Sequence, residues 1–377
     1  MDLSYTPEEE EYRARLGEWL AKTLPALPAR PSPDDWPARR AYDLGWQRLL
    51  HDAGYADVHW DASPTVRLIF LEETEKAGAP YVGANFVGLL HAGPTIAAEG
   101  TPEQRARWLP PVLRGDEVWC QGFSEPDAGS DLAALRTRAR RDGDDYVVSG
   151  SKIWTSHAEV ADWCELLVRT DPEAPKHRGI SWLAMPMDAP GITVRPLRTL
   201  AGSAEFAEVF LDEVRVPAAN RVGEENDGWR VTMVTLSFER GTAFVGEVVA
   251  CRRVLREVAA EARRNGRWDD PALRRRLGRL DAGFRALWRL TQWNVSAAER
   301  DGGVPGVGGS VFKLAYSHAR QELYDTAADV LGPDSLDLDR PWVLERLSSL
   351  SYTIAAGTSQ IQRNIVAERV LGLPKGR

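Results

Sequence analysis

Residues 145–155, DYVVSGSKIWT, decide the fold class because their hydrophobic pattern is that of a β-strand in a chain that begins with helical patterns. Other short segments rich in β-branched residues lie nearby, and Gly, Pro and Asp separate them. They are WCELLVRTD (163–171), GISWLAMPMD (179–188), GITVRPL (191–197) and AEVFLDEVRVP (207–217). We therefore expect antiparallel strands joined by turns between about residues 118 and 218.

Helical spacing of apolar residues dominates the sequence on both sides of this region. Before it, the pattern appears in PEEEEYRARLGEWLAKTL (7–24), RRAYDLGWQRLLHDAG (39–54), VRLIFLEETEKAG (66–78) and TPEQRARWLPPVL (101–113). After about residue 222, long helical patterns return. The order predicts an α+β chain with a helical N-terminal domain at 1–117, a middle β domain at 118–218 and a C-terminal helical domain at 219–377.

Composition and charge indicate which partners, which compartment and which kinds of site to expect. The chain has 377 residues, 43% of them hydrophobic, and a net charge of −8, which argues against nucleic acid and anionic membranes as partners. The arginines at 252–253, 263–264 and 274–276 are interpreted as solvated helix faces. Three cysteines without a CxxC pair predict no disulfide and a reducing, cytoplasmic location. Scattered histidines predict no metal site, and no apolar run reaches the roughly 20 residues of a membrane helix.

Two neighbouring segments are candidates for chemistry. Residues 120–132, CQGFSEPDAGSDL, combine glycines and serines that suit contact with an anion or a polar ring edge, although a plain turn-rich connector has the same composition. Residues 150–158, GSKIWTSHA, place Trp154 beside hydroxyl groups, which suits stacking on a planar cofactor. A tryptophan at a strand end also serves as core, and we interpret His157 as a polar loop residue.

Two helical segments complete the candidates. In residues 228–255, Glu239 has small neighbours at helical spacing, and a buried glutamate in an apolar helix suits a general base, although an ion pair between helices is an alternative. Near the end of the chain, TIAAGTSQIQRNIVAERV (353–370) turns at Gly357 into a helix. Ser359 and Gln362 suggest a capping box at that turn.

Together, in this order, the motifs FSEPDAGSDL, GSKIWTS, DEVRVP, GEENDGW, FERG and GTSQIQRNIVAERVLGLP resemble the acyl-CoA dehydrogenase family over nearly the whole chain. The resemblance implies a C-terminal four-helix bundle, bound FAD and an acyl-CoA thioester lying between flavin and base. It places FAD against Gln121, Phe123, Ser124, Gly129, Ser130, Trp154, Thr155, Ser156, Thr358, Ser359 and Gln360. It places the substrate near Ser130, Arg240, Ala356 and Gly357.

The resemblance also implies where the catalytic base lies. Many family members carry a glutamate at the position of Ala356, whereas the isovaleryl-type branch carries the base before an arginine on a helix, as in Glu239–Arg240. Glu239 would then remove the Cα proton while hydride passes from Cβ to flavin N5, giving the 2-enoyl-CoA. The N–H of Ala356 would polarise the thioester carbonyl. An electron-transfer flavoprotein would accept the electrons.

Three segments depart from the family pattern. The usual R-x-x-F-G and glutamine are missing from residues 263–280, Asp329 stands where a glutamine is usual, and TLAGSAEFAEVF (199–210) lacks the usual Ser/Thr pattern. Similar departures, and TDPEAPKHRGIS (170–181), resemble an actinobacterial branch that includes sterol side-chain dehydrogenases. A homodimer or homotetramer is expected, with a heteromer as the alternative. Two rival functions stay open: a flavin oxidase or monooxygenase acting on a carrier-tethered acid, and an inactive subunit, against which Glu239 argues.

Overall fold

The computed structural model describes residues 4–60, 62–242, 245–300 and 308–374, apart from the side chains of residues 59, 237–242 and 298–300. It divides the chain into two compact units, each built from segments that are discontinuous in sequence. Unit 1 comprises Met1–Ala26, Ala62–Ala79 and Arg240–Arg377, and unit 2 comprises Leu27–Asp61 and Pro80–Glu239. The domain boundaries at 117 and 218 stay predictions. Both fall in the stretch between the helix that ends at Arg114 and the helix that begins at Gly228.

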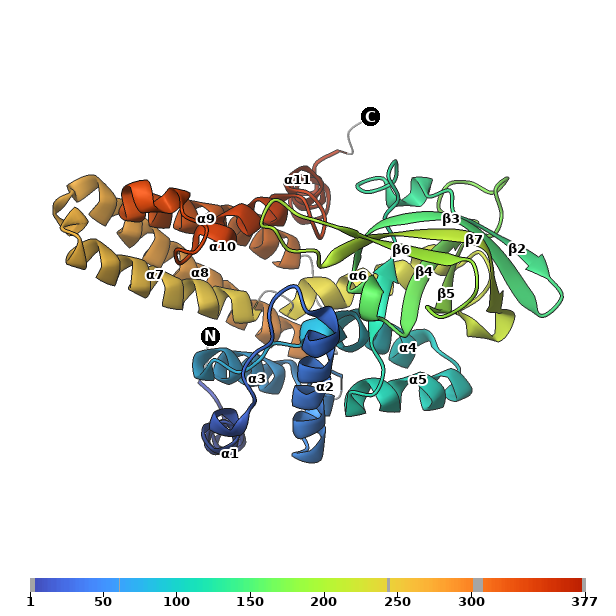
Figure 1. Cartoon of the computed structure of the whole chain (residues 1–377), viewed down its shortest axis with the longest axis horizontal. Coiled ribbons are helices and arrows are strands. Elements are labelled where there is room, and N and C mark those ends of the chain that lie inside the picture. The colour runs from blue at the N-terminus through green and yellow to red at the C-terminus, as the bar shows by residue number, and fades with distance from the viewer. Residues whose placement is uncertain (1–3, 61, 243–244, 301–307, 375–377) are drawn as a thin grey trace. The chain divides into compact units, whose positions relative to one another are not determined.

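Unit 2 contains an eight-stranded sheet with the order β6-β7-β3-β2-β4-β5-β8 and with β1 on β4 (Figure 1). The strands are β1 Trp119–Gly122, β2 Arg138–Asp142, β3 Asp145–Ser156, β4 Trp163–Arg169, β5 Ile180–Pro186, β6 Ile192–Leu197, β7 Phe206–Pro217 and β8 Arg221–Val222. Most neighbours are antiparallel, as predicted. Strand β4 differs, because it pairs in parallel with β1 and, at one residue pair, with β2.

Both faces of the central strand β4 are buried. Leu167 belongs to a core that includes Trp108 and Val112 of helix α5, whereas Leu166 and Val168 belong to a second core built mainly from strands. A strand covered on both faces carries a continuous apolar run instead of an alternating one. The helices of this unit are α2 Trp36–Asp52, α4 Gly93–Glu99, α5 Pro102–Arg114 and α6 Gly228–Thr242, the last of which ends beyond the unit boundary.

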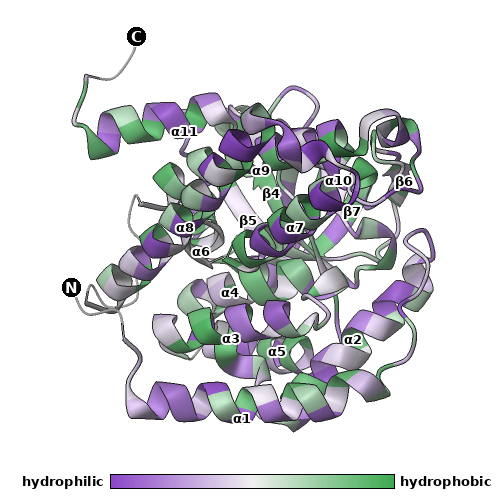
Figure 2. Ribbon diagram, turned by 90° about the vertical axis from the view of Figure 1, so that its left-hand side faces the viewer, coloured by the Kyte–Doolittle hydropathy of each residue, from purple (hydrophilic) through white to green (hydrophobic). Residues whose placement is uncertain are grey.

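Unit 1 is helical. Its helices are α1 Pro7–Thr23, α3 Pro64–Ala77, α7 Val245–Arg264, α8 Pro271–Arg300, α9 Gly308–Leu331, α10 Val343–Ser349 and α11 Ser359–Ile365. Helices α7, α8 and α9 pack against one another along their length, as their ribbons show (Figure 1). Hydrophobic and hydrophilic residues share each of these helices, since one face is buried and the other meets water (Figure 2). No described helix is long and apolar enough to cross a membrane.

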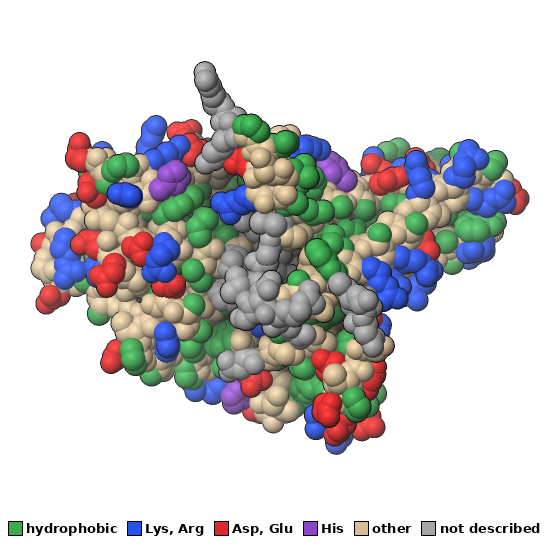
Figure 3. Space-filling view, turned by 180° about the vertical axis from the view of Figure 1, so that it is seen from behind, with side chains coloured by type: hydrophobic (Ala, Val, Ile, Leu, Met, Phe, Trp, Pro, Cys, Tyr) green, Lys and Arg blue, Asp and Glu red, His purple; other side chains and the backbone are tan. Residues whose placement is uncertain are grey.

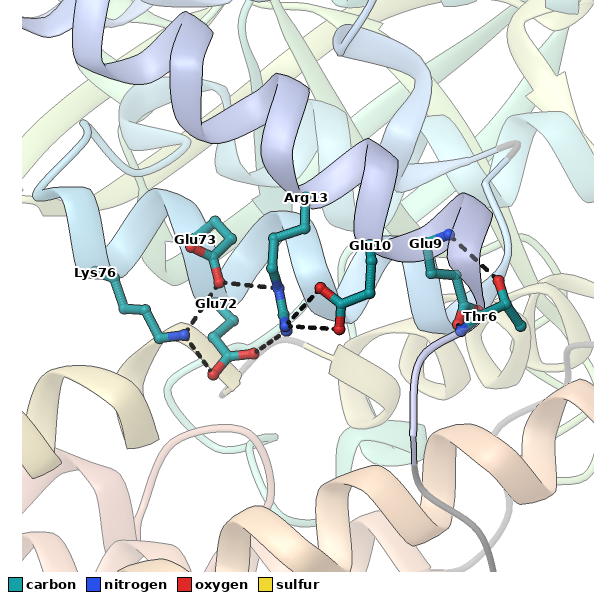
Figure 4. A network of polar contacts seen from close by, with 7 residues as sticks. All are labelled: Thr6, Glu9, Glu10, Arg13, Glu72, Glu73 and Lys76. Atoms are coloured by element: carbon teal, nitrogen blue, oxygen red, sulfur yellow. Dashed lines mark hydrogen bonds and ion pairs between the residues drawn. The ribbon is translucent and has the colours of Figure 1, made fainter.

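Charged residues tie α1 to α3 within unit 1. Arg13 of α1 contacts Glu72 and Glu73 of α3, and Lys76 contacts the same two carboxylates (Figure 4). Thr6 and Glu9 form a capping box that begins α1.

Over the face seen in Figure 3, basic and acidic side chains are interspersed. Most of the clustered arginines are exposed, and Arg253 pairs with Glu257 at 2.9 Å, in agreement with solvated helix faces.

Candidate functional site

The two sequence candidates of the middle region lie side by side in unit 2. The backbone N–H of Ile153 donates to the carbonyl of Ser124 at 3.0 Å, and Nζ of Lys152 donates to the carbonyl of Phe123 at 3.2 Å. Phe123 is buried, whereas Gly129 and Ser130 are exposed. The loop that follows β1 is therefore fixed at one end by β3 and open to solvent at the other.

A buried ion pair that sequence reasoning missed holds this loop. Oε1 of Glu125 accepts from Nζ of Lys152 at 2.9 Å, and its two carboxylate oxygens also accept from the backbone N–H groups of Arg136 and Thr137. Burial works to raise the pKa of Glu125, but Lys152 and the amide donors outweigh it, so the pKa lies below its ordinary value. The carboxylate therefore stays ionised and closes the loop on itself.

Gln121 of β1 turns its side chain into unit 2. Its amide nitrogen lies 2.8 Å from Oε1 of Glu165 and 3.0 Å from Nδ1 of His91. Glu165 stands opposite Gln121 in the parallel β1–β4 pair, and His91 lies in the π-helical turn Gly88–Ala92. The side chain of Gln121 thus belongs to a buried polar cluster, and its role toward FAD stays a prediction.

Trp154 is presented to solvent by a β-bulge. The pairing of β3 with β7 shifts between Lys152 and Thr155, so that two residues of β3, Ile153 and Trp154, face one residue of β7. Trp154 has φ of +63° and its side chain is 58% exposed, with the ring edge-on to Phe206. The bulge and the left-handed backbone therefore hold the ring of Trp154 toward solvent.

Thr155, the residue directly after Trp154, points inward. Thr155 is fully buried, and its Oγ1 finds no hydrogen-bond partner among the described residues. Ser156 pairs with Phe206 of β7. His157 lies in the turn after β3, as predicted for a polar loop residue. Its ring nevertheless packs 5.0 Å from the ring of Trp36, and burial, aided by Arg39, lowers its pKa to about 4.

The C-terminal turn in unit 1 is strained. Ala356 has φ of +52° and Gly357 has φ of +81°, and a Cβ on Gly357 would lie 2.7 Å from Nε2 of Gln362. The capping prediction was wrong by one residue, since Thr358 is the N-cap of α11 and its Oγ1 accepts from the N–H of Ile361 at 3.2 Å. Gln362 does not complete a capping box but donates to the carbonyls of Ala356 and Gly357.

The remaining predicted residues divide between exposed, buried and undescribed positions. Ser359 is buried, and its hydroxyl has no hydrogen-bond partner within the described chain, whereas Gln360 is exposed. Glu239 and Arg240 fall within the last turn of α6, and their side chains lie outside the described residues. Asp329, one of the departures from the family pattern, pairs with Arg276, which lies in a second departing segment at residues 263–280.

A second polar cluster in unit 1 also escaped sequence reasoning. Glu247 of α7 accepts from Tyr316 and Tyr352 and pairs with Arg320 of α9. Burial and the carboxylate raise the pKa values of both tyrosines well above their ordinary value, so they remain donors. Because two tyrosines and an arginine donate to it, the carboxylate of Glu247 joins α7 to α9.

The chain's residues fit a flavin cofactor of the FAD type. The buried hydroxyl of Thr155 in unit 2 has no partner within the described part of the chain, and the same is true, separately, of that of Ser359 in unit 1. A polar ligand is the kind of group that satisfies such a hydroxyl. Trp154 offers an exposed aromatic face. All three positions belong to the set for which FAD contact was predicted. Among the described residues no cluster of His, Cys, Asp or Glu is arranged to hold a metal ion.

Comparison with known proteins identifies the class. Models of the acyl-CoA dehydrogenase N-terminal, middle and C-terminal domains match residues 6–116, 120–214 and 226–371. The chain belongs to the acyl-CoA dehydrogenase family, whose members are FAD-dependent oxidoreductases, and its helical, β and helical regions are those of this fold. The predictions of family, fold class, enzyme class and cofactor are therefore confirmed.

Individual relatives show which members of the family this chain is similar to. Acyl-CoA dehydrogenase IpdE1 of Mycobacterium tuberculosis is 39% identical over 97% of this chain and 98% of its own length. A solved structure described as "Tcur3481-Tcur3483 steroid ACAD" is 32% identical, covers 100% of both chains and has a TM-score of 0.85. The ChsE4–ChsE5 complex from Mycobacterium tuberculosis is 33% identical, also covers 100% of both chains and has a TM-score of 0.81.

Proposed function

We propose that this protein catalyses the α,β-dehydrogenation of an acyl-CoA thioester to the 2-enoyl-CoA, with Glu239 as the base. The observation that carries the proposal is Ala356. Ala356 directly precedes Gly357 and Thr358, and it occupies the position at which many family members carry the catalytic glutamate. An alanine side chain cannot remove a proton, so the base must come from elsewhere. Glu239 lies on α6 immediately before Arg240, as in the isovaleryl-type branch.

The proposed division of labour follows from the chemistry of the reaction. The α C–H of a thioester is a weak acid, so proton removal by Glu239 needs a polarised carbonyl, and the N–H of Ala356 supplies a donor that requires no side chain. FAD, if bound, would supply flavin N5 as the acceptor of the hydride from Cβ. Trp154, Thr155 and Ser156, together with Phe123 and Ser124, are proposed to hold its ring system, and Ser130 and Gly357 to border the thioester.

Two of the relatives support a polycyclic acyl group and a second subunit. One solved neighbour is described as a steroid enzyme and another as a complex of two named chains. We therefore place sterol-derived thioesters first among substrates. We also place a heteromer beside the homodimer and homotetramer as the assembly. An electron-transfer flavoprotein is proposed as the electron acceptor and the cytoplasm as the location.

The test of the base is a comparison of Glu239→Gln with the wild type. Both are purified with FAD, mixed anaerobically with a panel of straight-chain, branched and sterol-derived acyl-CoAs, and followed in the visible spectrum. We expect the wild type to lose its flavin absorbance with one class of thioester, and Glu239→Gln to bind that thioester without bleaching. Glu257→Gln, at an exposed ion pair on α7, is the matched control and should bleach as the wild type does. Bleaching of Glu239→Gln at the wild-type rate overturns the assignment.

A further inference from the structure

A buried lysine lies behind the turn that contains Ala356. Lys313 of α9 is 2% exposed, and its Nζ donates to the carbonyl of Gly357 at 2.7 Å. An ammonium group is rarely buried in a protein, because removing it from water is costly unless it is hydrogen-bonded. Here one of its hydrogen bonds goes to the backbone of a turn that sequence comparison associates with catalysis.

Gln362 holds the same turn from α11. Its side chain is 1% exposed, and its Nε2 donates to the carbonyl of Ala356 at 3.0 Å and lies 3.4 Å from that of Gly357. Two buried side chains from two different helices therefore hold two consecutive carbonyls. Consecutive carbonyls held from one side constrain both peptide planes between Ala356 and Thr358.

The constraint determines where the N–H groups of the turn point. In a trans peptide the C=O and N–H vectors are opposed, and the structure has no cis peptide among its described residues. The N–H groups of Gly357 and Thr358 therefore point away from Lys313 and Gln362. The turn also holds Ala356 at φ of +52°, a conformation that an alanine adopts when its surroundings impose it. Because Gln362 holds the carbonyl of Ala356 and this left-handed backbone joins that carbonyl to the N–H of the same residue, the direction of the Ala356 N–H is set together with the turn.

We propose that Lys313 and Gln362 are positioning residues, which hold the Ala356–Gly357–Thr358 turn in the left-handed conformation that presents the N–H of Ala356 to the thioester carbonyl. The inference rests on the proposed function and assigns roles to two residues that act through the backbone of the turn. Their effect is greatest as negative charge develops on the carbonyl oxygen, because donors fixed in advance need no reorganisation at that moment. Loss of either residue therefore affects the rate of the chemical step more than thioester binding.

The experiment uses Lys313→Met and Gln362→Met, which keep side-chain length and remove the donors. Ser317→Ala is the matched control, because Ser317 is a buried residue of α9 whose hydroxyl bonds within its own helix. The first readout is amide hydrogen exchange of the purified protein over residues 351–363. Ala355, Ile361 and Gln362 donate backbone hydrogen bonds there and report the order of the turn. The second readout separates the rate of anaerobic flavin reduction from the thioester dissociation constant.

We expect exchange at residues 351–363 to accelerate by roughly tenfold or more in both variants, with Ser317→Ala unchanged in this segment. We expect flavin reduction to slow by roughly tenfold to a hundredfold, with thioester affinity changed by less than about threefold. Unchanged exchange, or faster exchange with an unchanged rate of reduction, overturns the proposal. If Lys313→Met does not fold, Gln362→Met decides alone. If no thioester reduces the wild type while exchange still rises in the variants, the turn is held as described and the proposed function is wrong.

Discussion

The ammonium group of Lys152 lies 2.9 Å from Oε1 of Glu125, and both side chains are buried. Glu125 belongs to the loop after β1, and Lys152 belongs to β3, so the pair joins the two segments in which most of the FAD contacts were predicted. Lys152 also donates a hydrogen bond to the backbone carbonyl of Phe123, which lies in the same loop as Glu125.

Removing one partner of this pair should be costly. We expect Lys152→Met to lower the free energy of unfolding by about 3–5 kcal/mol, because it leaves the Glu125 carboxylate buried without its counter-charge. The double variant Lys152→Met, Glu125→Gln should recover part of that loss. Urea denaturation followed by circular dichroism measures both. Lys176→Met, at an exposed pair with Asp131, should cost less than about 1 kcal/mol. Equal losses at the two lysines would contradict the account.

The entry to α6 depends on a glycine. A Cβ on Gly228 would lie 2.6 Å from backbone atoms of Ser181 in β5, which cannot move as a flexible side chain does. We expect Gly228→Ala to destabilise the protein by about 1–3 kcal/mol, in the range of overpacked sites. Gly45→Ala in α2, with no atom within 4 Å of the added carbon, should instead stabilise by about 0.5–1 kcal/mol. The melting temperatures of the two variants should therefore move in opposite directions, and a rise for Gly228→Ala would be inconsistent with the packing.

Protonation of His157 should weaken the fold in mild acid. Its pKa of about 4 lies below the value of 6.5 that it has when exposed, so the unfolded chain binds the proton more readily. The stabilisation is fully present above about pH 6.5 and is lost as the pH falls toward 4. Between pH 7.5 and pH 5 the wild type should lose about 2 kcal/mol through this group.

His157→Asn isolates that contribution, because asparagine tolerates the φ of +59° at this position and does not titrate. Urea titrations at the two pH values should show a smaller loss for the variant than for the wild type. Parallel losses in the two proteins would show that another group is responsible.

The cysteines should be unreactive in the folded protein. All three are free and buried, and burial raises the pKa of Cys251 to about 12 and that of Cys120 well above its ordinary value. We expect negligible reaction with Ellman's reagent near neutral pH over minutes, and three thiols per chain after unfolding in guanidinium. Rapid labelling of the native protein would contradict the burial.

Much of the fold could be predicted from local patterns. Helical spacing located α1, α2, α3 and α5, and β-branched runs located the main strands. The parallel pairing of β1 with β4 could not be predicted, because it joins segments more than forty residues apart and leaves no local mark. The grouping of α1 and α3 with the C-terminal helices is likewise a matter of long-range packing.

The candidate site, too, could be predicted only in part. The GSKIWTS motif predicted Trp154 as a site residue, but the exposure of its ring arises from a bulge that depends on pairing with β7. Lys152 and Lys313 are lysines at apolar positions, a signal that composition alone does not distinguish from a solvated face. At the C-terminal turn, Thr358 and Ser359 are both good N-cap residues, and the left-handed backbone before them selects Thr358.

The most direct test of the central claim is a stoichiometric anaerobic turnover of the FAD-loaded protein with its reactive acyl-CoA, measured by visible absorbance and by the mass of the thioester. We expect each flavin bleached to correspond to one thioester that has lost two hydrogen atoms. We also expect the flavin to stay reduced until an electron acceptor is added. A thioester that gains oxygen once air is admitted, or a flavin that air reoxidises at the rate of turnover, would contradict this expectation and identify a monooxygenase or an oxidase on this fold.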